Sequence, residues 1–147
     1  MTPDELTQQI LSEKEIEGIT VLGGEPFEQA GELSKVITAV HQKLSVIVFT
    51  GFTAEQLHSL HDPYTELILQ NTDVLIDGAY IKNQRSFDRP MVGSANQNFI
   101  FLTDRYTFED FPPNTVEIRI RQNGKIEMNG MGDFEEIARR FKEKNEL

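Results

Sequence analysis

The sequence contains no cysteine among its 147 residues. That absence excludes disulfide bonds, thiolate zinc sites, a cysteine nucleophile and any iron–sulfur cluster held by thiolates of this chain. With no disulfide framework to indicate an oxidising compartment, we expect a cytoplasmic protein. Long hydrophobic runs are also missing, because no apolar stretch approaches the roughly 20 residues of a membrane helix. The first residues show no signal-peptide pattern, so we expect no membrane association.

Basic residues are scarce. The chain has 14 Lys and Arg against 24 Asp and Glu, which gives a formal net charge of −10. The imbalance is greatest in residues 1–34, where Lys14 is the single basic residue among eight carboxylates. Binding to nucleic acid requires clustered lysine and arginine side chains that neutralise phosphates. The composition therefore indicates a solvated acidic surface and no nucleic-acid partner.

The length fits a single domain, residues 1–147, that is large enough to bury a core. We divide it into an α/β core, residues 1–110, and a C-terminal hairpin and helix, residues 115–147. The core begins with a helix signal at Thr2, which can cap a helix through residue 11 and form a capping box with Glu5.

Helices and strands alternate along the rest of the core. Apolar residues at steps of three and four predict a helix from about residue 26 to residue 43. Continuous apolar runs predict strands that are buried on both faces, as in a parallel sheet. Shorter helices follow Thr53 and open at Pro63, and a long loop follows Gly78. The predicted strands are residues 19–22, 45–50 and 73–77, with a fourth candidate at 98–102.

This order predicts parallel strands joined by right-handed crossovers, a topology whose ligands bind at the carboxyl ends of the strands. Three turns should therefore share one edge of the sheet. Two successive glycines let a backbone approach a ligand closely, and a Thr or Asp at a strand end can bond a ribose, an amine or a carboxylate. The candidate ligand-binding residues are Gly23, Gly24, Glu25, Pro26, Thr50 and Asp77.

Each of these motifs has an ordinary structural alternative. The segment 23–26 also suits a simple strand–turn–helix connection, and Thr50 and Asp77 also suit turn caps. Residues 92–97 are either a binding loop or a turn into the fourth strand. Three basic residues of the long loop either bind an anion or are solvated, and the histidine pair is too isolated to predict a metal site. These residues are Lys82, Arg85 and Arg89, and His58 and His61.

The C-terminal segment has the most regular pattern in the chain. Residues 116–121 alternate apolar and charged side chains, Asn123-Gly124 follows, and residues 125–128 resume the alternation. We predict a β-hairpin with a type I′ turn. A last helix then follows Gly132, with its apolar residues on one side.

Four segments together resemble the small radical S-adenosylmethionine activases. The likeness is greatest to the anaerobic ribonucleotide reductase activating proteins and more distant to the pyruvate formate-lyase activating enzymes, and it covers roughly residues 2–131. It implies a partial (β/α) barrel of mostly parallel strands, plus the C-terminal hairpin and helix. It also implies that residues 23–26 line the pocket for the methionyl end of S-adenosylmethionine. The four segments are 23–27, 48–53, 73–78 and 93–97.

In complete members of that family a 4Fe-4S cluster reduces the sulfonium and releases a 5′-deoxyadenosyl radical, which abstracts hydrogen from a glycine of a glycyl-radical enzyme. The family's three-cysteine loop follows a first strand and precedes the first helix, whereas here Met1 directly precedes that helix. We therefore expect a truncated domain whose first strand is missing. Val92 and Asn98 also stand where relatives often have arginines.

Without thiolates the chain cannot hold a cluster, so we predict no radical activity for the chain alone. The alternative function is a cluster-free module that binds S-adenosylmethionine, a nucleotide or another protein. A missing first strand leaves strand 19–22 at the sheet edge with unpaired backbone groups. We expect either self-association through this edge or its cover by residues 116–128, and the resemblance implies a glycyl-radical enzyme as partner.

Overall fold

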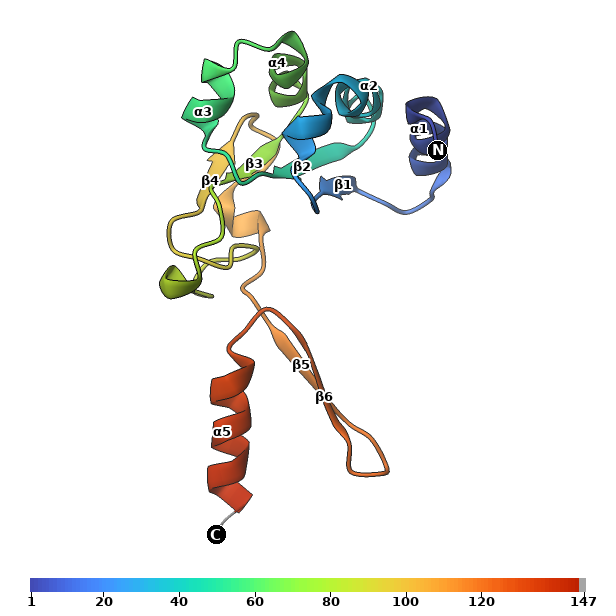
Figure 1. The fold of residues 1–147 in the computed structure, drawn as a ribbon. Coiled ribbons are helices and arrows are strands. Elements are labelled where there is room, and N and C mark those ends of the chain that lie inside the picture. The colour runs from blue at the N-terminus through green and yellow to red at the C-terminus, as the bar shows by residue number, and fades with distance from the viewer. Residues whose placement is uncertain (146–147) are drawn as a thin grey trace.

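The structure, a computed structural model, describes the backbone of residues 1–145 and the side chains of residues 1–143. Its central element is a four-stranded sheet in the order β1-β2-β3-β4. The first three strands are parallel, and β4 runs antiparallel to β3. The predicted α/β fold with mostly parallel strands is confirmed. The sheet is open and does not close into a barrel (Figure 1). The strands are β1 (Gly18–Val21), β2 (Ser45–Phe49), β3 (Val74–Asp77) and β4 (Asn98–Phe101).

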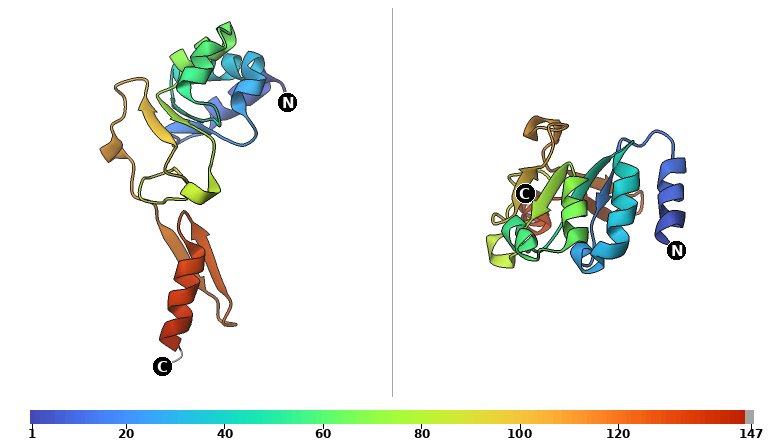
Figure 2. Two further views of the ribbon diagram at one scale, coloured as in Figure 1. Left: turned by 60° about the vertical axis from the view of Figure 1, so that its left-hand side comes forward. Right: turned by 90° about the horizontal axis from the view of Figure 1, so that it is seen from above.

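Helices cover one face of this sheet (Figures 1 and 2). Helix α2 (Ala30–His41) packs against α1 (Pro3–Ser12) on one side and α4 (Pro63–Gln70) on the other, and α3 (Ala54–Ser59) contacts α4. The predicted capping box of α1 is present, because Thr2 accepts the amide of Glu5 and donates its own amide to the Glu5 carboxylate. Short 3-10 helices complete the core: η1 (Pro26–Gln29), η2 (Lys82–Gln84) and η3 (Phe108–Asp110).

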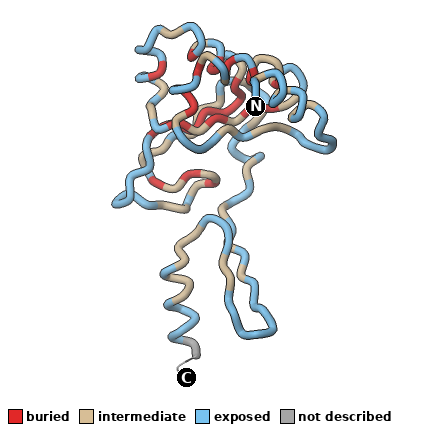
Figure 3. The backbone as a smooth tube through the Cα atoms, turned by 45° about the vertical axis from the view of Figure 1, so that its right-hand side comes forward, coloured by how far each residue is buried: buried red, intermediate tan, exposed pale blue. Residues whose placement is uncertain are grey.

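The sheet has an apolar layer on each face. On the helical face, side chains of α2, α3 and α4 meet those of β2 and β3, with Ile37, Leu57 and Ile68 fully buried. On the other face, Val74 and Ile76 are covered by Val92 and an aromatic cluster. Phe111 lies against Phe99 with ring centroids 4.8 Å apart. The connection from β4 to the C-terminal segment therefore forms the second cover of the sheet. Figure 3 shows that the buried residues gather in the part of the molecule that holds the sheet, and that the C-terminal segment has none among its described residues.

The C-terminal segment projects away from this core (Figures 1 and 2). Strands β5 (Val116–Ile120) and β6 (Ile126–Gly130) form a separate two-stranded antiparallel sheet, and α5 (Phe134–Asn145) follows. We call residues 116–145 the hairpin–helix arm. The predicted hairpin and last helix are thus present.

The predicted type I′ turn of this hairpin is wrong, and so is one of the two alternatives given for the edge of strand 19–22. A type I′ turn needs positive φ at both central residues, but only Gly124 has it, at +80°, and the amide of Gly124 bonds the carbonyl of Arg121. The turn is therefore a three-residue loop with a left-handed glycine. The hairpin also pairs only with itself, so residues 116–128 do not cover β1.

Strand β1 consequently forms one edge of the described sheet, paired with β2 alone. The amide of Ser45 donates to the carbonyl of Glu17 at 3.1 Å. Because backbone groups alternate along a strand, those of Ile19 and Val21 face β2 and those of Thr20 face outward. Self-association through this edge stays a prediction. No helix in the described part of the chain is both long and apolar enough to cross a membrane.

Candidate functional site at the carboxyl ends of the strands

The turn after β1 has an unusual backbone. Gly23 and Gly24 have φ of +87° and +57°, in the left-handed region that side chains with a Cβ rarely adopt. A Cβ at either glycine would meet no atom within 4 Å, so these residues face open space. Pro26 then opens η1, and both Pro26 and Phe27 are buried. The C-terminal end of the turn is therefore held by buried residues, whereas the backbone of its two glycines is exposed.

Glu25 connects this turn to the end of β2. Its Oε1 accepts hydrogen bonds from the amide of Phe27 at 3.1 Å and from the hydroxyl of Thr50 at 2.8 Å. Its Oε2 accepts the amide of Gly51 at 2.9 Å. One carboxylate thus caps η1 and holds the ends of two parallel strands together.

Thr50 in turn connects β2 to β3. Its hydroxyl accepts the amide of Phe52 at 3.1 Å, and its own amide donates to the carbonyl of Ile76 at 3.0 Å. The hydroxyl therefore both donates a hydrogen bond, to Glu25, and accepts one, from Phe52. Thr50 is also almost fully buried. Thr50 therefore positions the strand ends.

Asp77 makes the corresponding connection at the end of β3. The carboxylate is 2% exposed, with Oδ2 accepting the first amide of α3, at Ala54, and Oδ1 accepting the amide group of Asn98 at 2.7 Å. The next residue, Gly78, has φ of +95° and donates its amide to the carbonyl of Phe52 at 2.8 Å. The Asp77 carboxylate thus joins a helix start and the antiparallel strand to β3.

The loop before β4 closes the same edge. Oε1 of Gln97 accepts the amides of Gly93 and Ser94, and Nε2 of Gln97 donates to the carbonyl of Gly78 at 3.2 Å. Arg89 donates to the carbonyl of Gln97 at 2.6 Å. The segment that was predicted as a binding loop or a turn is thus a tightly bonded turn against the end of β3. Nearby, Asn96 has a buried Oδ1 with no hydrogen-bond partner in the described chain.

These turns form one continuous surface, which we call the rim: residues 22–26, 50–54, 77–79 and 92–98. The six candidate residues predicted from sequence all lie on it. In the described structure the amides of Gly23 and Gly24 have no hydrogen-bond partner, whereas Glu25, Thr50 and Asp77 bond to the rim itself. A cavity of about 500 Å³ adjoins the glycine turn and is lined by residues of α1, α2 and the turn, including Leu6, Gly23 and Pro26. A cavity of this size suits a small-molecule ligand.

The opposite end of the sheet has a polar cluster that the sequence analysis missed. Asp73 is 1% exposed and accepts the amide of Val46 at 2.8 Å, the hydroxyl of Thr103 at 2.7 Å and a ring nitrogen of His41 at 3.2 Å. Burial alone would raise the pKa of Asp73, but these three hydrogen bonds and the charge of Arg105 hold it below its ordinary value. No carboxylate oxygen is left for a ligand, so this cluster is structural.

The other polar candidates are also engaged within the chain. Arg89 holds the loop before β4, and the guanidinium of Arg85 lies 4.9 Å from the ring centre of Phe87. His58 lies 3.3 Å from the carboxylate of Glu66. Across the described residues no group of three or more His, Cys, Asp or Glu side chains is arranged to hold a metal ion.

Comparison with known proteins gives one finding. A family model described as a 4Fe-4S single cluster domain matches residues 1–100, which include α1, the four-stranded sheet up to β4 and the whole rim. Searches of curated proteins and of solved structures returned no match.

Proposed function

The chain belongs to the 4Fe-4S single cluster domain family, and from this membership we propose that it is a radical S-adenosylmethionine activase-like domain. In this proposal the rim binds the methionyl end of S-adenosylmethionine. The observation that carries it is the bridge from Glu25 to Thr50 and Gly51. The bridge fixes the turn after β1 while the amides of Gly23 and Gly24 remain unpaired beside a cavity. Those N–H groups are donors that suit the carboxylate group of an amino-acid ligand.

The family implies a 4Fe-4S cluster, but the residues of this chain do not fit one. Such clusters are held by cysteine thiolates, and the sequence contains no cysteine. The described structure also offers no alternative set of three metal-ligating side chains. We therefore propose that this chain binds the cosubstrate without cleaving it reductively. Incubation with iron, sulfide and S-adenosylmethionine should give neither cluster absorbance nor 5′-deoxyadenosine, and their appearance would contradict this part of the proposal.

Calorimetry with S-adenosylmethionine on the purified chain tests the binding proposal. We expect the wild-type chain to bind and the Gly23→Ala variant to bind at least about tenfold more weakly, because the added methyl group occupies the open side of the turn. Gly124→Ala is the matched control, since Gly124 also has positive φ and open space around it but lies in the distant hairpin. Both glycines have a positive φ, so an alanine strains the backbone at either position. Equal losses of affinity in the two variants, or no binding by the wild-type chain, would overturn the proposal.

A second function is supported by the open edge of β1. An edge strand with outward-facing backbone groups can accept a strand from another chain, and Thr20 presents such groups. In this alternative the chain is a cluster-free interaction module. The partner that the activase resemblance suggests is a glycyl-radical enzyme. If the chain bound that partner but failed to bind S-adenosylmethionine, the result would favour the interaction module over the S-adenosylmethionine-binding domain.

A further inference from the structure

The hairpin–helix arm has two apolar faces that the described chain covers only in part. On α5 the apolar side chains recur at steps of three and four and form one stripe: Phe134, Ile137, Ala138 and Phe141. On the hairpin the cross-strand pairs Ile118–Met128 and Ile120–Ile126 lie on one face, and Arg119–Glu127 lies on the other. Ile120 is 69% exposed and Ile126 is 48% exposed.

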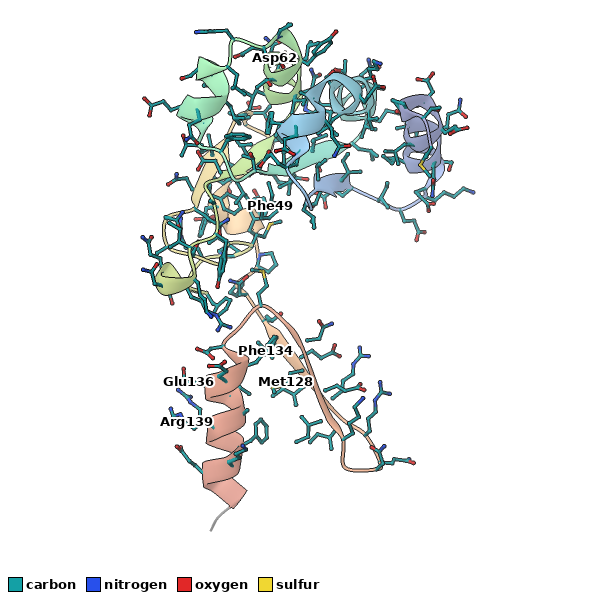
Figure 4. The ribbon with its side chains drawn as sticks, in the orientation of Figure 1. Phe49, Asp62, Met128, Phe134, Glu136 and Arg139 are labelled. Atoms are coloured by element: carbon teal, nitrogen blue, oxygen red, sulfur yellow. The ribbon has the colours of Figure 1, made fainter. Side chains whose placement is uncertain are left out.

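The two faces look toward each other without forming a core. Figure 4 shows Met128 on the side of the hairpin toward α5, whereas Glu136 and Arg139 lie on the outer side of the helix. A cavity of about 360 Å³ opens beside Ile137 and Phe141. No residue between 116 and 143 is fully buried. An isolated hairpin and an isolated helix of this length are each marginal in water, so these faces need a cover.

The charge of the arm indicates what that cover is. Residues 116–143 contain six basic and six acidic side chains, whereas residues 1–115 contain seven basic and 17 acidic ones and so carry the whole net charge of −10. Within the arm the charges neutralise one another locally, as in the pairs Arg119–Glu117, Arg121–Glu127 and Arg139–Glu143. No unbalanced charge remains to select an acidic or basic partner. The arm is also the part of the surface where two copies of this acidic protein meet with the least repulsion.

We propose that the hairpin–helix arm is a homodimerisation surface, covered by the arm of a second copy of this chain. In the dimer α5 of one copy lies on the apolar hairpin face of the other, and the two-fold axis repeats the contact. Each arm supplies both halves of the interface, a narrow helical stripe and a flat strand face, so the surface is self-complementary. The proposal does not depend on cosubstrate binding at the rim.

Sedimentation velocity of the full chain over a range of concentrations tests this inference. We expect a reversible monomer–dimer equilibrium in the wild-type protein. Ile120→Lys places a charge in the proposed interface and should raise the dimer dissociation constant at least about tenfold. Phe141→Lys on α5 should do the same. Both side chains are exposed in the single chain, so circular dichroism of the variants should match that of the wild type.

Two controls assign the surface. Leu60→Lys alters an exposed leucine at the end of α3 and should leave the dimer intact. Thr20→Pro removes an outward-facing amide of β1 and should also leave it intact. A single-chain mass at every concentration would overturn the inference, as would a dimer that Ile120→Lys and Phe141→Lys do not weaken. A dimer lost only in Thr20→Pro would assign self-association to the β1 edge and overturn it equally.

Discussion

The carboxylate of Glu25, in the turn after β1, accepts a hydrogen bond at 2.8 Å from the hydroxyl of Thr50, the residue that follows β2. The two residues are 25 positions apart in the sequence, and the parallel pairing of β1 with β2 brings them together. The same carboxylate also accepts the amides of Phe27 and Gly51. A side chain whose sequence context suggested ligand binding is thus a support of the ligand-binding surface.

Glu25→Gln should destabilise the protein. The variant keeps one acceptor oxygen, but its amide nitrogen cannot accept the bond that Oε2 receives from Gly51, and the remaining bonds lose their charge. We expect the free energy of unfolding to fall by about 1–3 kcal/mol, measured by urea denaturation. Glu28→Gln is the control, because Glu28 is exposed in η1, the 3-10 helix that Glu25 caps, and its change should stay within about 0.5 kcal/mol. Equal effects of the two substitutions would contradict the supporting role of Glu25.

Sequence periodicity was enough to predict the rim. Continuous apolar runs identified β1, β2 and β3, and parallel pairing then required that their carboxyl ends lie at one edge. The sequence could not distinguish a residue that binds a ligand from one that forms hydrogen bonds with neighbouring rim residues. Both roles favour Thr, Asp or Glu after a strand. That distinction depends on distances such as those from Asp77 to Ala54 and Asn98.

Other features depended on contacts that no local pattern encodes. The antiparallel direction of β4 follows from the loop that folds back across the end of β3, where Gln97 and Arg89 hold it. The hairpin turn was assigned as type I′ from Asn123-Gly124, but the structure adds Gln122 to the loop and needs only one left-handed residue. Asp73 was assigned only as the start of an apolar strand, although its three donors come from distant segments.

Asp73 should make the stability of the protein dependent on acidic pH. Its folded-state pKa lies below the ordinary value, since hydrogen bonds from Thr103, Val46 and His41 and the charge of Arg105 outweigh the effect of burial. A carboxyl whose pKa is lowered by folding contributes stability above its unfolded pKa, near 3.9, and loses it as the pH falls through the folded pKa. We therefore expect stability to decline below about pH 4.

Asp73→Asn tests this assignment. The variant should lose stability at neutral pH, and its remaining stability should decline less steeply between about pH 4 and pH 2. Asp88→Asn, on the exposed loop after η2, serves as the control. The measurement is urea denaturation at a series of pH values. Parallel pH profiles for the wild type and Asp73→Asn would show that another carboxylate causes the decline.

Tyr106 should have the opposite dependence, at alkaline pH. Its hydroxyl lies 2.9 Å from a carboxylate oxygen of Glu17 and 2.8 Å from the Ser45 hydroxyl. Burial raises the pKa of Tyr106, the Ser45 contact opposes this rise, and the Glu17 carboxylate adds to it. A raised folded-state pKa means that the contribution is complete below the unfolded pKa, about 10, and is lost as the pH rises through the folded pKa.

Tyr106→Phe should therefore reduce the free energy of unfolding by about 1 kcal/mol at neutral pH and by less at alkaline pH. Tyr64→Phe, at an exposed position on α4, should change stability little at any pH. Denaturation of both variants at neutral pH and above pH 10 provides the comparison. If the difference in free energy of unfolding between wild type and Tyr106→Phe grew as the pH rose, the predicted loss of the Tyr106 contribution at alkaline pH would be contradicted.

Gln97→Glu should loosen the loop that closes the rim, although it changes few atoms. One oxygen of the new carboxylate can still accept the amides of Gly93 and Ser94. The other oxygen replaces Nε2 and then faces the carbonyl of Gly78, so a donated hydrogen bond at 3.2 Å becomes a repulsive contact between two acceptors. We expect a loss of about 1–3 kcal/mol in the free energy of unfolding.

Gln84→Glu is the matched control for this substitution, because Gln84 is exposed in the same long loop and its side chain makes no hydrogen bond in the described structure. Its effect should stay within about 0.5 kcal/mol. Lowering the pH should restore stability to Gln97→Glu selectively, since a protonated carboxyl regains a donor for the Gly78 carbonyl. Urea denaturation at neutral and mildly acidic pH measures both effects. If Gln97→Glu were as stable as Gln84→Glu at neutral pH, the hydrogen bond to Gly78 would not hold the loop.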